Sequence, residues 1–411
     1  MPPINKLRAA LTPGARRRAV PRVAAEPGLR QLRTALTVFF ALDGFVFAGW
    51  VVRIPAVKEQ TGASSSALGL ALLGVSVGAV LTMTLTGRLC QRFGARPVAV
   101  TAALVLAASV ALPPHTASPL TLGLVLLVFG AAFGAMNVSV NSVAVDLVAA
   151  LGRPVMPSFH AAYSLGGMLG AGVGGLAAGQ LSAARHLGAL AVFGVAVAAI
   201  AARSLLVAPM PPRPEPDGAA ATEGGARPAG TRWLVLVLGL IALCTAYGEG
   251  ALADWSALHL QESLGAGAGV AAAGYSVFAL AMTVGRLTGS ALLERLGQTR
   301  ALVAGGVTAA LGMLLGTLGP TVWVVLLGFV IAGLGLANIF PVAIGRAGEL
   351  AGAQGVAAAS TLGYGGFLLG PVAIGFLADW FSLAVAMTTV ALLAAVAAAT
   401  AYATRRSFRP G

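Results

Sequence analysis

Ionisable side chains stand in stretches of this sequence that are otherwise apolar. Asp43 lies well inside one such stretch, Glu249 and Asp254 share a second, and His160 lies early in a third. Placing an ionisable group in a lipid bilayer costs on the order of 3 kcal/mol, so such a group usually faces a cavity or a partner. The carboxyl group of Asp43 could therefore carry a proton or a cation, anchor a solute, or pair with a nearby arginine or hydroxyl group.

Glu249 and Asp254 are five residues apart, which corresponds to about 140° around a helix with 3.6 residues per turn. The two carboxyl groups therefore do not share one face. We expect Glu249 to be the deeper group and Asp254 to be a solvated carboxylate near the outer end of its helix. His160 could change its charge near neutral pH, or it could hydrogen-bond a backbone group or Asp146. The candidate proton carriers are Asp43, Glu249 and His160.

Uncharged polar and aromatic residues form the second set of candidates. The amides of Asn137 and Asn338 both donate and accept hydrogen bonds, which suits the hydroxyl groups of a sugar-like or other polar solute. The same amides could instead join neighbouring helices, and aromatic residues could pack or mark the membrane interface. The candidate solute-binding residues are Asn137, Asn141, Asn338, Tyr163, Tyr247, Trp50 and Tyr364.

The composition requires that these residues be positioned by membrane-spanning helices. Of the 411 residues, 58% are hydrophobic and 9% are charged, whereas roughly a quarter of the residues in a soluble domain are charged. Apolar windows long enough to span a bilayer, at roughly 20 residues each, are centred near Gly44, Val77, Leu106, Phe129, Gly170, Ala196, Ala242, Ala279, Leu311, Phe329, Gly366 and Leu392. The chain is therefore predicted to be an all-α integral membrane protein with about twelve transmembrane helices.

A segment rich in proline, glycine and charge divides the windows into two sets of six. The predicted organisation is a basic tail (1–33), an N-terminal six-helix half (34–207), a linker (208–232), a C-terminal six-helix half (233–404) and a short tail (405–411). The isolated cysteines, Cys90 and Cys244, suggest neither a disulfide nor a metal site.

Basic residues set the expected orientation. The net charge is +13, but these residues are scattered between apolar spans rather than gathered on one surface, which argues against nucleic-acid binding. Only Arg53, Lys58 and Arg185 fall in odd-numbered connections, whereas the tails, the linker and the even-numbered connections hold the rest, Arg286 included. By the positive-inside rule, both termini and the linker are predicted to be cytoplasmic in a multi-pass protein of the cell (inner or plasma) membrane.

Three motifs of the first half recur in the second. Gly134-Ala135-Met136-Asn137 recurs as Gly335-Leu336-Ala337-Asn338, and Arg92-Phe93-Gly94 recurs as Arg295-Leu296-Gly297. The glycines Gly166, Gly170 and Gly175 are matched by Gly366, Gly370 and Gly375. Because the three pairs occur in the same order and at nearly one spacing, they indicate two parallel repeats of six helices.

The turn after the second span carries a family resemblance. Its sequence, Gly87-Arg88-Leu89-Cys90-Gln91-Arg92-Phe93-Gly94-Ala95-Arg96, resembles the pattern G-x-L-x-D-R-x-G-R-R of the major facilitator superfamily. Gln91 stands where that family usually has aspartate, so a salt bridge is lost there. The candidate cytoplasmic gating residues are Gly87, Gln91, Arg92, Gly94 and Arg96, with Glu294, Arg295, Gly297 and Arg300 in the second copy.

Within that superfamily, three further segments resemble a bacterial branch related to fucose permease. They are residues 137–146, 153–160 and 249–256. Apolar residues near Val51 and Phe133 replace the two acids of fucose permease, so its sugar specificity and proton carriers do not transfer directly. The glycine runs of the fifth and eleventh spans also resemble a motif of antiporters, although they equally serve close helix packing.

The resemblance implies a secondary active transporter that works by alternating access, functions as a monomer and needs no cofactor. Its partners would be a small polar or sugar-like solute, protons and the lipid bilayer. It implies a central cavity lined by the first, fourth, seventh and tenth spans, with Asn137 and Asn338 on opposing walls. The alternatives are an efflux antiporter of drugs or metabolites and, on the same scaffold, a non-transporting sensor or an enzyme. The sequence has no Walker-type nucleotide motif and its four histidines are dispersed, so we expect no enzyme.

Overall fold

The structure is a computed structural model that describes residues 27–151, 155–208 and 229–406. Its described part contains twelve helical segments long and apolar enough to cross a membrane, which confirms the predicted fold class. The helices of the first half are α1 (Pro27–Val51), the short α2 (Ile54–Thr61), α3 (Ser65–Phe93), α4 (Ala95–Ser109), α5 (Pro119–Leu151), α6 (Met156–Ala178) and α7 (Ala183–Val207).

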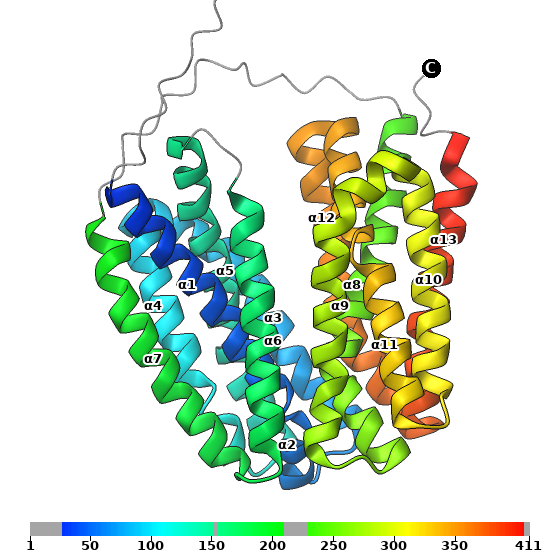
Figure 1. The fold of residues 1–411 in the computed structure, drawn as a ribbon, viewed down its shortest axis with the longest axis horizontal. Coiled ribbons are helices and arrows are strands. Elements are labelled where there is room, and N and C mark those ends of the chain that lie inside the picture. Colours follow the sequence, from blue (N-terminus) through cyan, green and yellow to red (C-terminus); the bar gives the residue numbers. More distant parts are fainter. Residues whose placement is uncertain (1–26, 152–154, 209–228, 407–411) are drawn as a thin grey trace, which may run out of the picture.

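The second half repeats this order without a counterpart of α2. Its helices are α8 (Ala229–Leu264), α9 (Ala268–Leu296), α10 (Gln298–Leu318), α11 (Val322–Leu336), α12 (Ile339–Trp380) and α13 (Leu383–Ala403). The tenth span combines α11 with the start of α12, and the rest of α12 is the eleventh span. Figure 1 shows two bundles side by side that approach each other at the α2 end and diverge towards the opposite end.

Two boundaries differ from the prediction. Helix α1 begins at Pro27, inside the segment predicted as a basic tail, because Leu29 and Leu32 are buried and hold that turn on the bundle. Helix α8 begins at Ala229, within the predicted linker. The remainder of the predicted tails and linker, at 1–26, 209–228 and 407–411, lies outside the described residues.

Repeated glycines allow close packing of helix backbones in both halves. A side chain on Gly166 or Gly170 would collide with the backbone of α1 at Ala41 or Phe45, and one on Gly366 would collide with the backbone of α8. Small residues let helix backbones approach closely in a bilayer, where apolar side chains gain little from packing on each other. The runs therefore press α6 onto α1 and α12 onto α8, which positions the acidic residues of α1 and α8.

The halves meet along two helix pairs, α3 with α12 and α6 with α9. Close approach again requires small residues, because a side chain on Gly69 would meet the backbone of Pro371 and one on Gly375 would meet that of Ser65. Near the middle of the interface, the Ser76 hydroxyl donates to the carbonyl oxygen of Phe367 at 3.1 Å. These contacts enclose a space between the two bundles.

Candidate functional site

A cavity of about 410 Å³ lies between the two halves. Its lining comes from α1, α3, α5 and α6 of the first half and from α8, α9 and α12 of the second. All four spans expected to line it do so, the tenth through Phe340. The walls are largely apolar and aromatic, with a small number of polar groups, which is the usual make-up of a site for a small molecule.

An ion pair stands in the cavity wall of the second half. The Arg286 guanidinium donates through Nη2 to Glu249 Oε1 and Oε2 at 3.3 and 3.2 Å. The prediction that Arg286 lies in a cytoplasmic connection is wrong, since it stands within the eighth span and lines the cavity. Loop assignment by charge alone misplaced it because the balancing carboxylate lies on another helix. Glu249 is thus a paired carboxylate rather than an isolated one.

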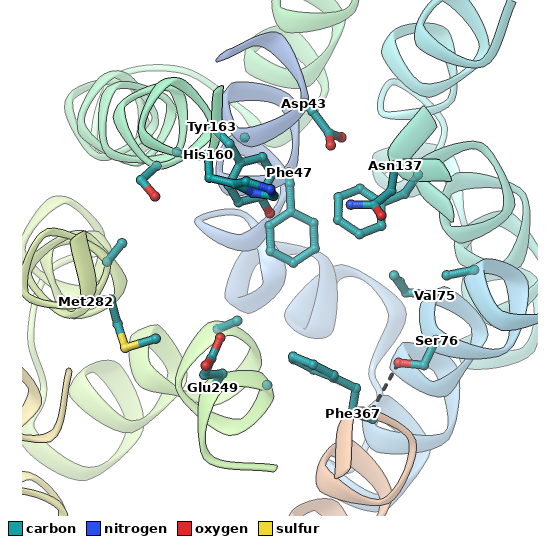
Figure 2. Close-up of a pocket in the computed structure, with 18 of the residues that line it drawn as sticks. Asp43, Phe47, Val75, Ser76, Asn137, His160, Tyr163, Glu249, Met282 and Phe367 are labelled. Carbon is teal, nitrogen blue, oxygen red and sulfur yellow. Dashed lines mark hydrogen bonds between the residues drawn. The ribbon is translucent and has the colours of Figure 1, made fainter. Parts of the chain in front are cut away.

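Asp43 in α1 is the contrasting acid. It lines the cavity, is only 2% exposed, and its Oδ1 atom has no hydrogen-bond partner within the described chain. The next residue, Gly44, packs against the backbone of α6 at Tyr163, where any larger residue would collide. That contact fixes the depth and direction of Asp43. Figure 2 shows Asp43, Tyr163 and Asn137 on one side of the pocket and Glu249 on the other.

Asp254 also lines the cavity, which corrects its expected place near a helix end. Helix α8 continues to Leu264, so Asp254 is not in its last turn. Tyr275 of α9 lies near enough to Asp254, Glu249 and Arg286 to interact electrostatically with all three. Helical spacing puts the two carboxyl groups on different faces of α8, yet both line the cavity, together with Tyr275 of the neighbouring α9.

Most of the other predicted site residues line the same cavity. They are Asn137, Asn141, His160, Tyr163, Trp50 and Tyr364. The Asn141 side chain donates to the Asn137 carbonyl oxygen at 2.8 Å. His160 packs its ring against Phe40, with 5.5 Å between the ring centroids. The side-chain amide of Asn137 makes no hydrogen bond with the described residues, so it is available to a solute.

Asn338 and Tyr247 are not on the cavity wall, where we expected them. Asn338 sits at the junction of α11 and α12 and donates through Nδ2 to the carbonyl oxygen of Gly285 in α9, at 2.8 Å. Gly289 leaves the room for its amide. The Tyr247 hydroxyl shares a 2.9 Å hydrogen bond with that of Thr389. Sequence symmetry between Asn137 and Asn338 did not carry over because the helix is interrupted only in the second half.

The two turns of the family motif have matching backbones. Gly94 and Gly297, between α3 and α4 and between α9 and α10, have φ angles of 88° and 74°, which favour glycine. Arg96 donates through Nη1 to the Ala208 carbonyl oxygen at 2.6 Å, within the first half. A side chain on Gly87 would meet nothing within 4 Å, so this glycine serves no close helix contact in the described structure.

In the first of these two turns, the polar residues Gln91 and Arg92 are exposed. The Arg92 guanidinium lies 5.3 Å from the centre of the neighbouring Phe93 ring. Glu294, Arg295 and Arg300 occupy the corresponding places around the second turn. A gating role for these residues remains a prediction.

The α2 end of the molecule carries polar contacts that sequence reasoning missed. Asp379, in the last turn of α12, accepts hydrogen bonds from the backbone N–H groups of Ser65 and Ser66, both at 2.9 Å. These groups belong to the first turn of α3, where N–H groups lack partners in the helix and attract negative charge. The Lys58 ammonium pairs with Glu262 of the other half. Ser64 just before α3 is a local signal of a helix start, but a cap supplied by another helix leaves no local signal.

Comparison with known families identifies the scaffold. The sequence model described as the Major Facilitator Superfamily matches residues 34–287 and 238–410. The chain belongs to the major facilitator superfamily. An uncharacterized MFS-type transporter of Yersinia pestis is 34% identical over 388 residues, covering 93% of this chain and 98% of that protein. Membrane protein MosC of Rhizobium meliloti is 30% identical over 391 residues, 94% of each chain.

Solved structures of other transporters share the fold at low sequence identity. A bacterial homologue of the human lysosomal transporter Spinster, in an inward-facing and unoccupied conformation, has a TM-score of 0.78 at 16% identity, covering 93% of this chain and 98% of that one. A D-xylose–proton symporter has a TM-score of 0.71 at 15% identity, covering 91% and 97%. This superfamily member is thus a multi-pass membrane protein of a transporter family, and its solute must be argued from its own cavity.

Proposed function

We propose that this chain is a secondary active transporter that carries a small polar solute through the central cavity by alternating access, coupled to protons. One observation supports this most directly: a largely apolar cavity that contains an unpaired carboxyl group lies between two helix bundles joined at one end. Rocking of the bundles would expose that cavity to each side of the membrane in turn. We further propose that the chain acts as a monomer.

The contacts between halves support the rocking motion. The Asp379 bonds and the Lys58–Glu262 pair both lie at the α2 end, where Figure 1 shows the bundles approaching each other. They are few, polar and partly exposed, so they can break and re-form at low cost. With the termini cytoplasmic, as the basic residues favour, the α2 end faces outward and this conformation is open inward.

For the coupling, we assign Asp43 first and Glu249 second as proton carriers, with His160 beside them in the cavity. Burial in a low-dielectric site favours the protonated form of an unpaired carboxyl group, so such a group would exchange a proton with water when the cavity opens. Protonation of Glu249 would in turn release Arg286 from its partner. Each acid could therefore link its own protonation to a local rearrangement.

Purified protein in proteoliposomes that enclose a pH-sensitive dye provides the test. Candidate solutes would include D-xylose and uridine, since solved structures with this fold include a D-xylose–proton symporter and a nucleoside transporter. We expect at least one solute to move protons across the membrane and Asp43→Asn to abolish solute accumulation while solute exchange persists at concentrations high enough to fill the site. Accumulation with an unchanged pH dependence in both Asp43→Asn and Glu249→Gln would rule out both carriers.

The direction of the proton current separates the main alternatives. Solute and proton moving together indicates symport, whereas opposite movement indicates the efflux antiporter. A sensor or an enzyme on this scaffold would move neither. We also propose that the chain is related to the fucose permease branch. The relatives support membership of the superfamily but not this narrower assignment.

A further inference from the structure

The cavity carries more negative than positive groups. Among the described residues that line it, the acids are Asp43, Glu249 and Asp254, and Arg286 is the arginine or lysine that balances them. Arg286 is engaged by Glu249. The remaining carboxyl groups therefore face the cavity without a protein cation beside them, which is a costly arrangement in a largely apolar site.

Asp43 is the clearest case of a carboxyl group without a cation beside it. Its side chain is almost fully buried, yet Oδ1 has no partner, although buried polar atoms are normally hydrogen-bonded. Tyr163, which lines the same cavity, lies close enough to interact electrostatically with Asp43, Glu249 and Arg286. A ligand that donates to Asp43 would supply the missing partner at a fixed point of α1.

Aromatic rings line the same cavity. Phe47 and Phe133 pack together with 5.1 Å between their centroids, and both line the cavity with Phe40. Figure 2 shows Phe47 in the middle of the pocket, between Asp43 and Glu249. Ring faces attract cations, and a carboxylate with aromatic rings is a common recognition set for ammonium groups. A bare metal ion would instead require several oxygen ligands, which these rings do not supply.

We propose that the transported solute is an organic cation: a small molecule with an ammonium group held by Asp43 and a polar group, such as a hydroxyl, held by the free amide of Asn137. This inference rests on the proposed function, because it names the solute class of the same cavity. The volume of about 410 Å³ accommodates a molecule of several heavy atoms rather than a single ion. Asp254 and Tyr275 extend the polar wall on the other half.

The test compares solutes of matched shape that differ in charge. Melting temperatures and calorimetric affinities of the purified full chain are measured with choline against 3,3-dimethylbutanol, and with D-glucosamine against D-glucose. A ligand that binds the folded state raises its melting temperature by mass action. We expect stabilisation by the cations and none by their neutral partners. Asp43→Asn should weaken cation binding at least about tenfold, since a hydrogen bond to a charged group is lost.

Matched variants separate this effect from misfolding. Glu59→Gln removes an exposed charge outside the cavity and should bind cations like the unaltered protein. Asp43→Glu keeps the charge and should keep the preference for cations. If Asp43→Asn fails to fold, the comparison of charged with neutral solutes in the unaltered protein still decides.

Four results would overturn the inference: equal binding of neutral partners, equal stabilisation by sodium ions alone, unchanged cation affinity in a folded Asp43→Asn variant, or binding of neither cation. Proton-coupled transport of a neutral solute such as D-xylose would leave the proposed function standing and refute only the charge of the solute. Absence of coupled transport for any bound solute would refute the proposed function itself.

Discussion

Asp379→Asn should shift the conformational equilibrium of the transporter away from the form closed at the α2 end. The carboxylate of Asp379 accepts two hydrogen bonds of 2.9 Å from the first turn of α3, which belongs to the other half. Asparagine keeps one acceptor oxygen but loses the second and the negative charge. The resulting opening should be visible as a longer distance between the halves at that end.

The magnitude follows from the two interactions that are lost. One hydrogen bond contributes about 0.5 to 1.5 kcal/mol net, and a charge at an exposed helix N-terminus contributes about 0.3 to 1 kcal/mol. Because Asp379 is exposed, solvent screening holds the sum to about 1 to 2 kcal/mol, which corresponds to a shift of roughly 5- to 30-fold in the equilibrium.

Spin labels on cysteines at Ala117 and Ser263, exposed on opposite halves at this end, would report the distance distribution. Cys90 and Cys244 are replaced beforehand. Glu59→Gln, which removes an exposed charge from α2 without a contact between halves, serves as the control. An Asp379→Asn distribution that matches this control would show that the helix cap does not hold the two halves together.

Two further predictions concern residues in and beside the cavity. Arg286→Ala should destabilise the protein by about 1 to 3 kcal/mol because it leaves the half-buried Glu249 without its partner. The Arg286→Ala/Glu249→Ala double variant should recover part of this loss, and additive effects in chemical unfolding would contradict the pairing. Asn338→Ala should lower the free energy of unfolding by about 1 to 2 kcal/mol and leave solute affinity unchanged. Asn137→Ala should weaken binding of whichever probe stabilises the unaltered protein, and the opposite pattern would exchange the roles of the two residues.

The sequence determined the spans and the duplication of this protein. Apolar windows of sufficient length predict membrane helices because an unpaired backbone group is too costly in lipid, so the twelve spans follow from hydropathy and length alone. The repeated glycines likewise predicted close packing, and the structure places Gly166 and Gly170 against α1 and Gly366 against α8. Asp43 could be recognised as a candidate because one carboxyl group in an apolar stretch is a local signal.

Only the tertiary structure decided which polar residues meet. Arg286 is a basic residue near the end of an apolar stretch, and nothing local shows that Glu249 of another helix neutralises it. Asn338 repeats Asn137 in sequence but bonds to Gly285 instead of facing the cavity. The cap from Asp379 to Ser65 joins residues far apart in the chain. Helix periodicity fixes the face on which a residue lies, whereas its partner depends on how the helices pack, and that is a property of the whole bundle.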